Sequence, residues 1–116
     1  MPLPPKRAVQ RARERIQSIR TSVAGLDLLC SGTLSERMMK CGKSNCRCAS
    51  DPEGRHGPYF EWVHMRRGKP THRYVTAQQA VILRQAIANY RRVKKLLREW
   101  EDNTERLIDA DDPTQP

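Results

Sequence analysis

The chain has 116 residues and a formal net charge of +9, and 30% of its residues are charged whereas 5% are aromatic. This length allows one small domain with a modest core, and no segment is long and apolar enough to cross a bilayer. No apolar stretch follows the first charges as in a secretion signal, so we expect a cytoplasmic protein with no membrane partner and with reduced cysteines. Such chains often depend on a metal ion, a disulfide or oligomerisation.

The basic and acidic residues are separated along the chain. Residues 1–98 hold 21 Lys or Arg against 6 Asp or Glu, and residues 99–116 hold 1 Arg against 7 Asp or Glu. A basic body favours a polyanionic partner, with nucleic acid first and DNA ahead of RNA. Ordinary solvated charge on exposed helices is the simpler alternative.

The N-terminal region predicts a disordered, Pro-rich segment over residues 1–5 and a helix over residues 6–30. Apolar residues recur in this helix at steps of three and four, which places them on one stripe: Val9, Ala12, Ile16, Ile19, Val23 and Leu26. Gly32 lies just beyond the predicted helix end, where Cys30 is expected to be a buried apolar residue. Residues 33–40 fit a strand, although their composition also favours a helix.

Residues 33–57 form a Cys/His segment with four candidate metal ligands: Cys41, Cys46, Cys48 and His56. Three thiolates and an imidazole suit tetrahedral zinc, and in an extended segment Cys46 and Cys48 would project to the same side. The C-x4-C-x-C spacing differs from the paired C-x2-C ligands of common zinc sites. A closed four-ligand shell predicts a structural zinc site and not a catalytic one.

Other interpretations of the Cys/His segment stay open. The thiols can pack as reduced apolar residues while His56 forms hydrogen bonds in a turn, or one pair of cysteines can be redox-active. An iron–sulfur cluster would need Cys30 as a further ligand, and His72 or a water molecule would replace His56 if that histidine does not bind. Three basic neighbours would stabilise thiolates: Lys43, Arg47 and Arg55.

Residues 58–75 predict a β-hairpin whose turn lies at residues 67–70, because aromatic and β-branched residues flank a Gly/Pro pair. Alternation assigns two opposite faces to the first of its strands. Phe60, Trp62 and His64 share one face, and the other face is formed by Tyr59, Glu61, Val63 and Met65.

Residues 77–108 predict a long C-terminal helix, which Thr76 and Gln79 begin with a capping box. Its apolar stripe has the same spacing as that of the first helix: Leu83, Ala86, Tyr90, Val93, Leu97 and Trp100. The two helices can therefore pack antiparallel in one chain or across a dimer, or both stripes can cover the small sheet. Residues 109–116 are expected to be a disordered acidic tail. The predicted fold is therefore α+β in a single small domain over residues 6–108: helix, short strand and Cys/His loop, β-hairpin in a small antiparallel sheet, and helix.

The chain resembles a family of short prokaryotic proteins, domain-of-unknown-function family 6788, over about its middle two thirds. The most specific shared features are the CGK-x-x-C-x-C run that begins at Cys41 and the HGPY run that begins at His56. Further matches are Gly32-Thr33-Leu34, Gly68-Lys69, Arg73-Tyr74-Val75 and Asn89-Tyr90-Arg91-Arg92. The aromatic run that usually follows HGPY is interrupted here by Glu61 and Trp62. The resemblance implies an architecture and an association with transposons and other mobile elements, but no activity.

The sequence thus predicts a small basic accessory or regulatory protein that binds nucleic acid and contains zinc. The candidate contacts to nucleic acid lie on the hairpin and beside the cysteines: Arg66, Arg67, Lys69, Arg73, Lys43, Arg47 and Arg55. Phe60, Trp62 and Tyr74 could stack on unpaired bases, although a small core also needs them. The alternative is a protein-interaction module, a coiled-coil dimer or one that docks on a recombinase or transposase, without direct contact to nucleic acid.

No enzymatic activity is expected from this sequence. The acidic residues before residue 99 are scattered without a pair suited to acid/base catalysis. The chain also has neither a phosphate-binding Gly-rich loop of the P-loop type nor a nucleophile elbow.

Overall fold

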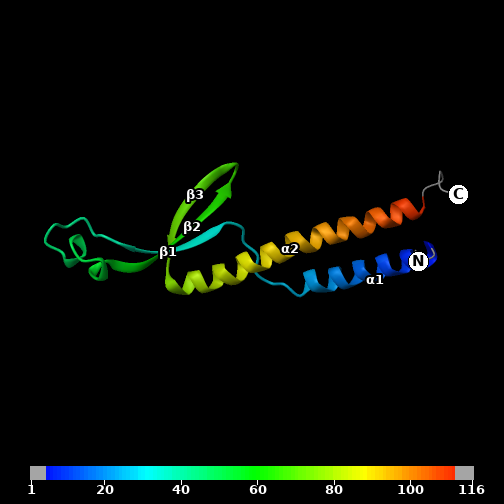
Figure 1. Cartoon of the computed structure of the whole chain (residues 1–116), viewed down its shortest axis with the longest axis horizontal. Coiled ribbons are helices and arrows are strands. Elements are labelled where there is room, and N and C mark those ends of the chain that lie inside the picture. Colours follow the sequence, from blue (N-terminus) through cyan, green and yellow to red (C-terminus); the bar gives the residue numbers. More distant parts are fainter. Residues whose placement is uncertain (1–4, 112–116) are drawn as a thin grey trace. The chain divides into compact units, whose positions relative to one another are not determined.

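The computed structural model describes residues 5–111, and in this range the chain forms two α-helices, three strands and two short 3-10 helices. Their order along the chain is α1 (Pro5–Ala24), β1 (Thr33–Met39), η1 (Arg47–Ala49), η2 (Pro52–Gly54), β2 (His56–Arg66), β3 (Lys69–Val75) and α2 (Ala77–Ala110) (Figure 1). The predicted α+β fold is confirmed. Neither of the two α-helices described is long and apolar enough to traverse a membrane.

The described residues group into two compact units, where a single domain is predicted from the sequence. The helical unit contains α1 and the second half of α2, which begins at Asn89. The sheet unit, Leu28–Ala88, contains the three strands, the Cys/His segment and the first half of α2.

The strands of the sheet unit pair in the order β1-β2-β3, and both pairs are antiparallel. The β2–β3 connection is a two-residue turn, Arg67-Gly68, with φ values of 53° and 78°. Two positive φ angles match the twist of a tight hairpin, so the turn is shorter than the predicted four residues. The tip of this hairpin points away from the first half of α2 (Figure 1).

One face of the sheet packs against the first half of α2. Phe60 is buried on this face, and the guanidinium of Arg84 lies 5.4 Å from the centre of its ring. Trp62, on the same face, donates a hydrogen bond from Nε1 to the Ser31 carbonyl at 3.0 Å. Four residues of α2 complete this core: Ala80, Leu83, Ala86 and Ile87. Phe60 and Trp62 are thus structural.

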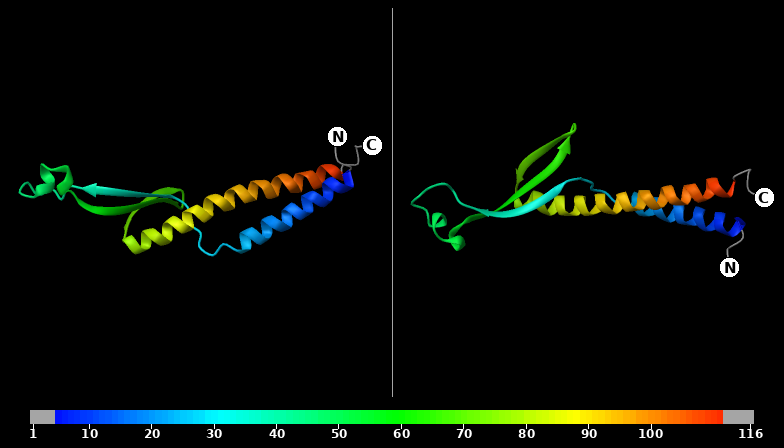
Figure 2. Two further views of the ribbon diagram at one scale, coloured as in Figure 1. Left: turned by 60° about the horizontal axis from the view of Figure 1, so that its bottom comes forward. Right: turned by 45° about the horizontal axis from the view of Figure 1, so that its top comes forward.

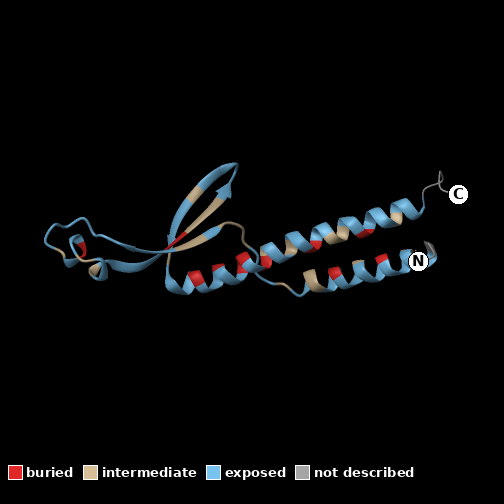
Figure 3. Cartoon of the chain, in the orientation of Figure 1, coloured by how far each residue is buried: buried red, intermediate tan, exposed pale blue. Residues whose placement is uncertain are grey.

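In the helical unit, α1 and the second half of α2 lie side by side and run antiparallel (Figure 2). Ala12 and Ile19 of α1 and Leu96 of α2 are buried, as Figure 3 shows by colour along both helices. Arg15 of α1 also forms an ion pair with Glu99 of α2. The two helices of this unit therefore pack antiparallel within one chain, but Leu97 of the predicted stripe is exposed and Leu96 is buried instead.

The ends of several elements differ from the predicted positions. The first helix ends at Ala24 and not at residue 30, because Gly25 weakens a helix and its N–H closes the last turn on the Thr21 and Ser22 carbonyls. The last helix is longer than predicted and includes Asp109 and Ala110, so those residues do not belong to a disordered tail. The rest of that predicted tail, residues 112–116, and residues 1–4 of the predicted N-terminal segment lie outside the described residues.

The start of the last helix agrees with its predicted capping box. The Thr76 N–H donates to Gln79 Oε1 at 2.8 Å, and the Gln79 N–H donates to Thr76 Oγ1 at 3.0 Å. The hydroxyl and amide oxygens thereby satisfy backbone donors that the first turn of any helix leaves unpaired.

Candidate metal centre

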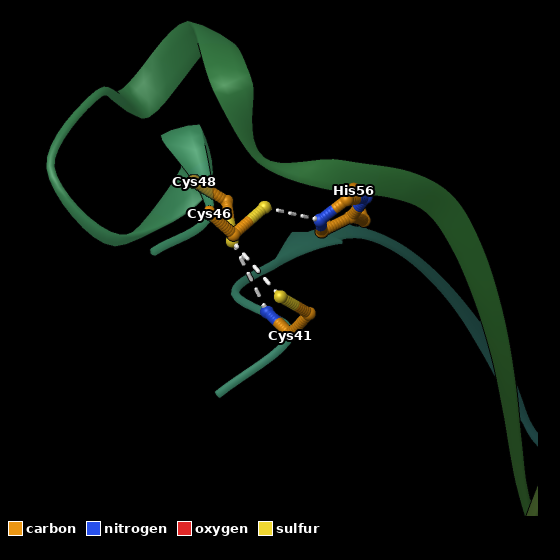
Figure 4. A group of neighbouring side chains, drawn as sticks. All are labelled: Cys41, Cys46, Cys48 and His56. Carbon is orange, nitrogen blue, oxygen red and sulfur yellow. Dashed lines mark hydrogen bonds between the residues drawn. The ribbon is translucent and has the colours of Figure 1, made fainter. Parts of the chain in front are cut away.

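The four predicted metal ligands lie together at the end of the sheet unit, between β1 and β2. The Sγ atoms of Cys41, Cys46 and Cys48 and the nearest ring nitrogen of His56 all lie within 4.8 Å of one another. Cys46 Sγ is 3.1 Å from His56 Nε2, and Cys48 Sγ is 3.5 Å from Cys41 Sγ (Figure 4). The predicted clustering of the four side chains is therefore confirmed.

Three different backbone conformations bring these ligands together. Cys41 follows the end of β1 and His56 begins β2, so the strand pair itself brings them to one end of the sheet. Cys46 caps the N-terminus of η1 and Cys48 lies within it, so this segment is a tight turn and not the extended chain predicted. A second turn, η2, is capped by Asp51, whose side chain accepts a hydrogen bond from the Glu53 N–H.

The local hydrogen bonds favour an ionised thiol at Cys46. Its pKa is lowered to about 6, first because the backbone N–H of Cys48 donates to its sulfur and second because His56 hydrogen-bonds to it. Arg47, which is predicted to stabilise the thiolates, forms an ion pair with Asp51 at 2.8 Å and is not among the groups that lower the pKa of Cys46. Neither Lys43 nor Arg55 contributes to the lowered pKa of Cys46.

Cys48 is the buried member of the cluster. The Cys41 N–H donates to its sulfur at 3.3 Å, which favours the thiolate. Burial and the neighbouring thiols of Cys46 and Cys41 outweigh this donor and raise the pKa of Cys48 overall. A cation at the centre of the cluster would reverse this balance, because it stabilises every thiolate that it contacts.

The donor set and its dimensions fit zinc. Tetrahedral zinc with Zn–S bonds near 2.3 Å and a Zn–N bond near 2.0 Å requires ligand atoms about 3.5–3.8 Å apart. The distances of 3.1 and 3.5 Å in the cluster and its 4.8 Å limit bracket this requirement. Cys41, Cys46, Cys48 and His56 would then hold the ion, with no position left open for a substrate.

Two further histidines and the fourth cysteine lie apart from this cluster. His72 lies on the sheet with Nδ1 3.7 Å from the Glu61 carboxylate, and His64 stacks on Trp62 with ring centres 3.7 Å apart. Cys30 is half-buried, and its N–H donates to the Ala86 carbonyl at 3.2 Å. The structure therefore brings only His56 to the three clustered cysteines, and the alternative ligands His72 and Cys30 are not among them.

The predicted nucleic-acid contacts occupy three places in the sheet unit. Arg66, Arg67 and Lys69 surround the hairpin turn, whereas Arg73 lies opposite Trp62 and lines a small cavity at the start of α2. The remaining three flank the Cys/His cluster in the chain: Lys43, Arg47 and Arg55. They therefore do not form one continuous set.

The sheet also has a polar and aromatic face that the sequence does not reveal as a site. Glu61 is buried there between Arg37 at 3.6 Å and His72 at 3.7 Å. Beside it the rings of Tyr59 and Tyr74 meet edge to face with centres 6.4 Å apart. Strand alternation places Tyr59 with Glu61, but the partners from β1 and β3 depend on register, which the sequence does not specify.

Comparison with known proteins identifies the family but no characterised relative. The family model described as Domain of unknown function (DUF6788) matches residues 7–85. The chain belongs to this family. No curated protein and no solved structure matches it. The matched range includes the whole Cys/His cluster and the hairpin, and it ends within the first half of α2.

Proposed function

We propose that the protein binds nucleic acid through its sheet unit, whose Cys/His segment is held by a structural zinc ion. The proposal rests on one observation, a set of basic side chains in the sheet unit that form no ion pair within the described residues. The role is one of binding and not of catalysis. The link to transposons and other mobile elements that the family resemblance implies stays a prediction.

The charge balance of the sheet unit supports this proposal. Its residues include ten Lys or Arg and four Asp or Glu. Three of the basic residues form ion pairs with acids: Arg37, Arg47 and Arg84. Within the described part of the chain, no ion pair involves the other seven: Lys40, Lys43, Arg55, Arg66, Arg67, Lys69 and Arg73. Unpaired cations on a small unit are what a polyanion recognises.

The hairpin is the best-placed part of this basic set. Arg66, Arg67 and Lys69 are exposed at a turn that points away from the helix of its own unit. A two-stranded ribbon fits the major groove of DNA, where such side chains reach phosphates and guanine edges. We therefore assign these three residues the largest share of the electrostatic contact.

The exposed tyrosines add a contact that single strands can use. Tyr59 is 43% exposed and Tyr74 is 57% exposed, unlike the buried Phe60 of the opposite face. Aromatic rings on a sheet surface stack on unpaired bases, with about 1–3 kcal/mol for each base. We expect the unit to bind single strands as well as duplex DNA.

Removal of the hairpin charges tests the proposal. The triple variant Arg66→Ala, Arg67→Ala and Lys69→Ala should weaken binding of a labelled duplex and reduce the salt slope, because log affinity changes by about 0.9 per phosphate contact for each decade of salt. If the variant makes three fewer phosphate contacts, the ratio of the wild-type affinity to the variant affinity should fall roughly 40-fold as the salt concentration rises from 50 to 200 mM. Fluorescence anisotropy across a salt series measures both quantities.

A matched control removes the same charge elsewhere. Three exposed residues of α1 form no ion pair within the described residues: Lys6, Arg7 and Arg13. Alanine favours a helix, so its introduction at these positions should preserve α1. The variant with these three residues replaced by alanine should retain most of the wild-type slope. Equal losses of affinity in both triple variants would indicate a response to net charge alone, and the hairpin would then not be the contact surface.

A further inference from the structure

An apolar stripe on the second half of α2 is exposed to solvent, although α1 packs against a neighbouring side of the same helix. Leu97 is 44% exposed and Ile108 is 66% exposed. The sequence predicts Leu97 as part of the buried stripe, but Leu96 takes that place. The exposed stripe is a shallow, open surface on α2 that is formed by Leu97, Trp100, Glu101, Thr104, Glu105 and Ile108.

The charges along this half of α2 are separated into two blocks. Residues 91–98 contain five basic residues and no acidic residue, whereas residues 99–111 contain six acidic residues and one basic residue. The α-helix turns by about 100° per residue, which places Lys94 and Arg98 on the same flank of the stripe as Glu105 and Asp109. This flank is therefore positive in its first part and negative in its last part.

Two pairs of like charges along this flank are unfavourable within one chain. Lys94 and Arg98 are four residues apart, as are Glu105 and Asp109, and like charges at this spacing destabilise an isolated helix. Within the part of the chain that the structure describes, none of these four side chains forms an ion pair. A partner that binds the stripe would relieve both repulsions if it presented the opposite order of charge.

We propose that the stripe docks on the same stripe of a second copy of this chain, with the two α2 helices antiparallel about a two-fold axis. Antiparallel helices place the same flank of each helix together. The positive part of each copy then meets the negative part of the other. A parallel pair would instead bring residues 91–98 of both copies to the same height, with basic block near basic block, so the charge pattern favours the antiparallel arrangement.

The helix periodicity also gives the register of this pair. An axis between Asp102 and Asn103 places Leu97 of one copy beside Ile108 of the other. Arg98 then falls between Glu105 and Asp109 of the second copy, and the symmetry repeats this contact. Both apolar ends of the stripe are covered at the same time, which a shifted antiparallel register does not achieve.

Sedimentation velocity from micromolar to millimolar protein tests the proposal. The wild-type chain should show a monomer–dimer equilibrium, and Arg98→Glu should weaken it at least tenfold because two contacts per dimer become repulsive. The triple variant Arg98→Glu, Glu105→Arg and Asp109→Arg should restore dimerisation, since it exchanges the charges on the two sides of the Arg98 contact. The control Arg92→Glu changes an exposed residue on the far side of α2 and should leave the equilibrium unchanged.

Loss of folding is separated from loss of the contact by a second variant. Leu97→Ser with Ile108→Ser alters two exposed side chains, so it should abolish dimerisation while the helical circular dichroism remains. A monomer at every concentration, a dimer that tolerates this double variant, or a charge exchange that fails to restore association would each overturn the proposal. Nucleic-acid binding is measured separately, so the two proposals can fail independently.

Discussion

Replacement of Cys48 by serine tests whether a zinc ion holds the Cys/His segment in its ordered conformation. Residues 40–55, sixteen in all, contain a single buried residue, and that residue is Cys48. Fixing the backbone of sixteen residues costs about 1 kcal/mol each, or ~16 kcal/mol, whereas burial of one small side chain contributes about 1–2 kcal/mol. A structural zinc ion contributes about 10–16 kcal/mol, which is the magnitude that an ordered segment needs.

The effect of Cys48→Ser should therefore be local. The core of the sheet unit around Phe60 and Leu83 lies on α2 and β2 and does not include the Cys/His segment. We expect the variant to lose its zinc and its amide-exchange protection over residues 41–55, while the strands and helices retain theirs. Trypsin should cleave the variant first at Arg47 or Arg55.

Native mass spectrometry with and without a chelator supplies the stoichiometry, and hydrogen exchange locates the change. Cys30→Ser is the matched control, because Cys30 lies outside the cluster and its replacement should leave one zinc per chain in place. Two results would refute the reasoning: a Cys48→Ser chain that still holds one zinc, or a wild-type chain whose hydrogen exchange is the same with and without the chelator.

Two further predictions concern the backbone and the helical pair. Gly32→Ala should lower the free energy of unfolding by more than about 2 kcal/mol, because φ is +114° and the new Cβ would lie 2.4 Å from the Val63 carbonyl oxygen. Gly42→Ala, at φ +86° with no atom within 4 Å of the new Cβ, should lower it by about 1 kcal/mol, and urea denaturation measures both. Arg15→Gln should destabilise the helical unit at neutral pH, because Arg15 holds the pKa of Glu99 below its ordinary value of 4.5. That contribution is present above pH 4.5 and is lost as the pH falls through the lowered pKa, so thermal melts of variant and wild type should converge in acid.

The elements with strong local signals could be predicted from the sequence. The capping box at Thr76, the alternation around Phe60 and the clustering of Cys41 with His56 all depend on residues close in sequence or on the pairing of neighbouring strands. The helix end at Ala24 is not predicted by the apolar spacing, because Leu26 continues that spacing whereas Gly25 decides the conformation. Apolar periodicity alone does not indicate whether the helix continues to Leu26 or ends before Gly25.

The features that depend on tertiary packing could not be predicted. Leu96 and Leu97 are equally apolar, and only the side of α2 that α1 covers decides which of them is buried. The environment of Glu61 requires Arg37 from β1 and His72 from β3, which the strand register brings together. The conformation of η1, a tight turn in place of an extended segment, likewise follows from how the Cys/His segment closes on itself.

The most direct test of the central claim is the salt dependence of nucleic-acid affinity for zinc-loaded and zinc-stripped protein. Anisotropy of a labelled duplex and a labelled single strand gives this dependence in one experiment. If the sheet unit binds nucleic acid and zinc holds its Cys/His segment, the loaded protein should bind both probes at low salt, with log affinity falling linearly with log salt. Stripping the zinc should weaken binding and flatten the slope, because Lys43 and Arg55 lose their fixed positions. No binding at low salt, or identical curves for both forms, would contradict the account.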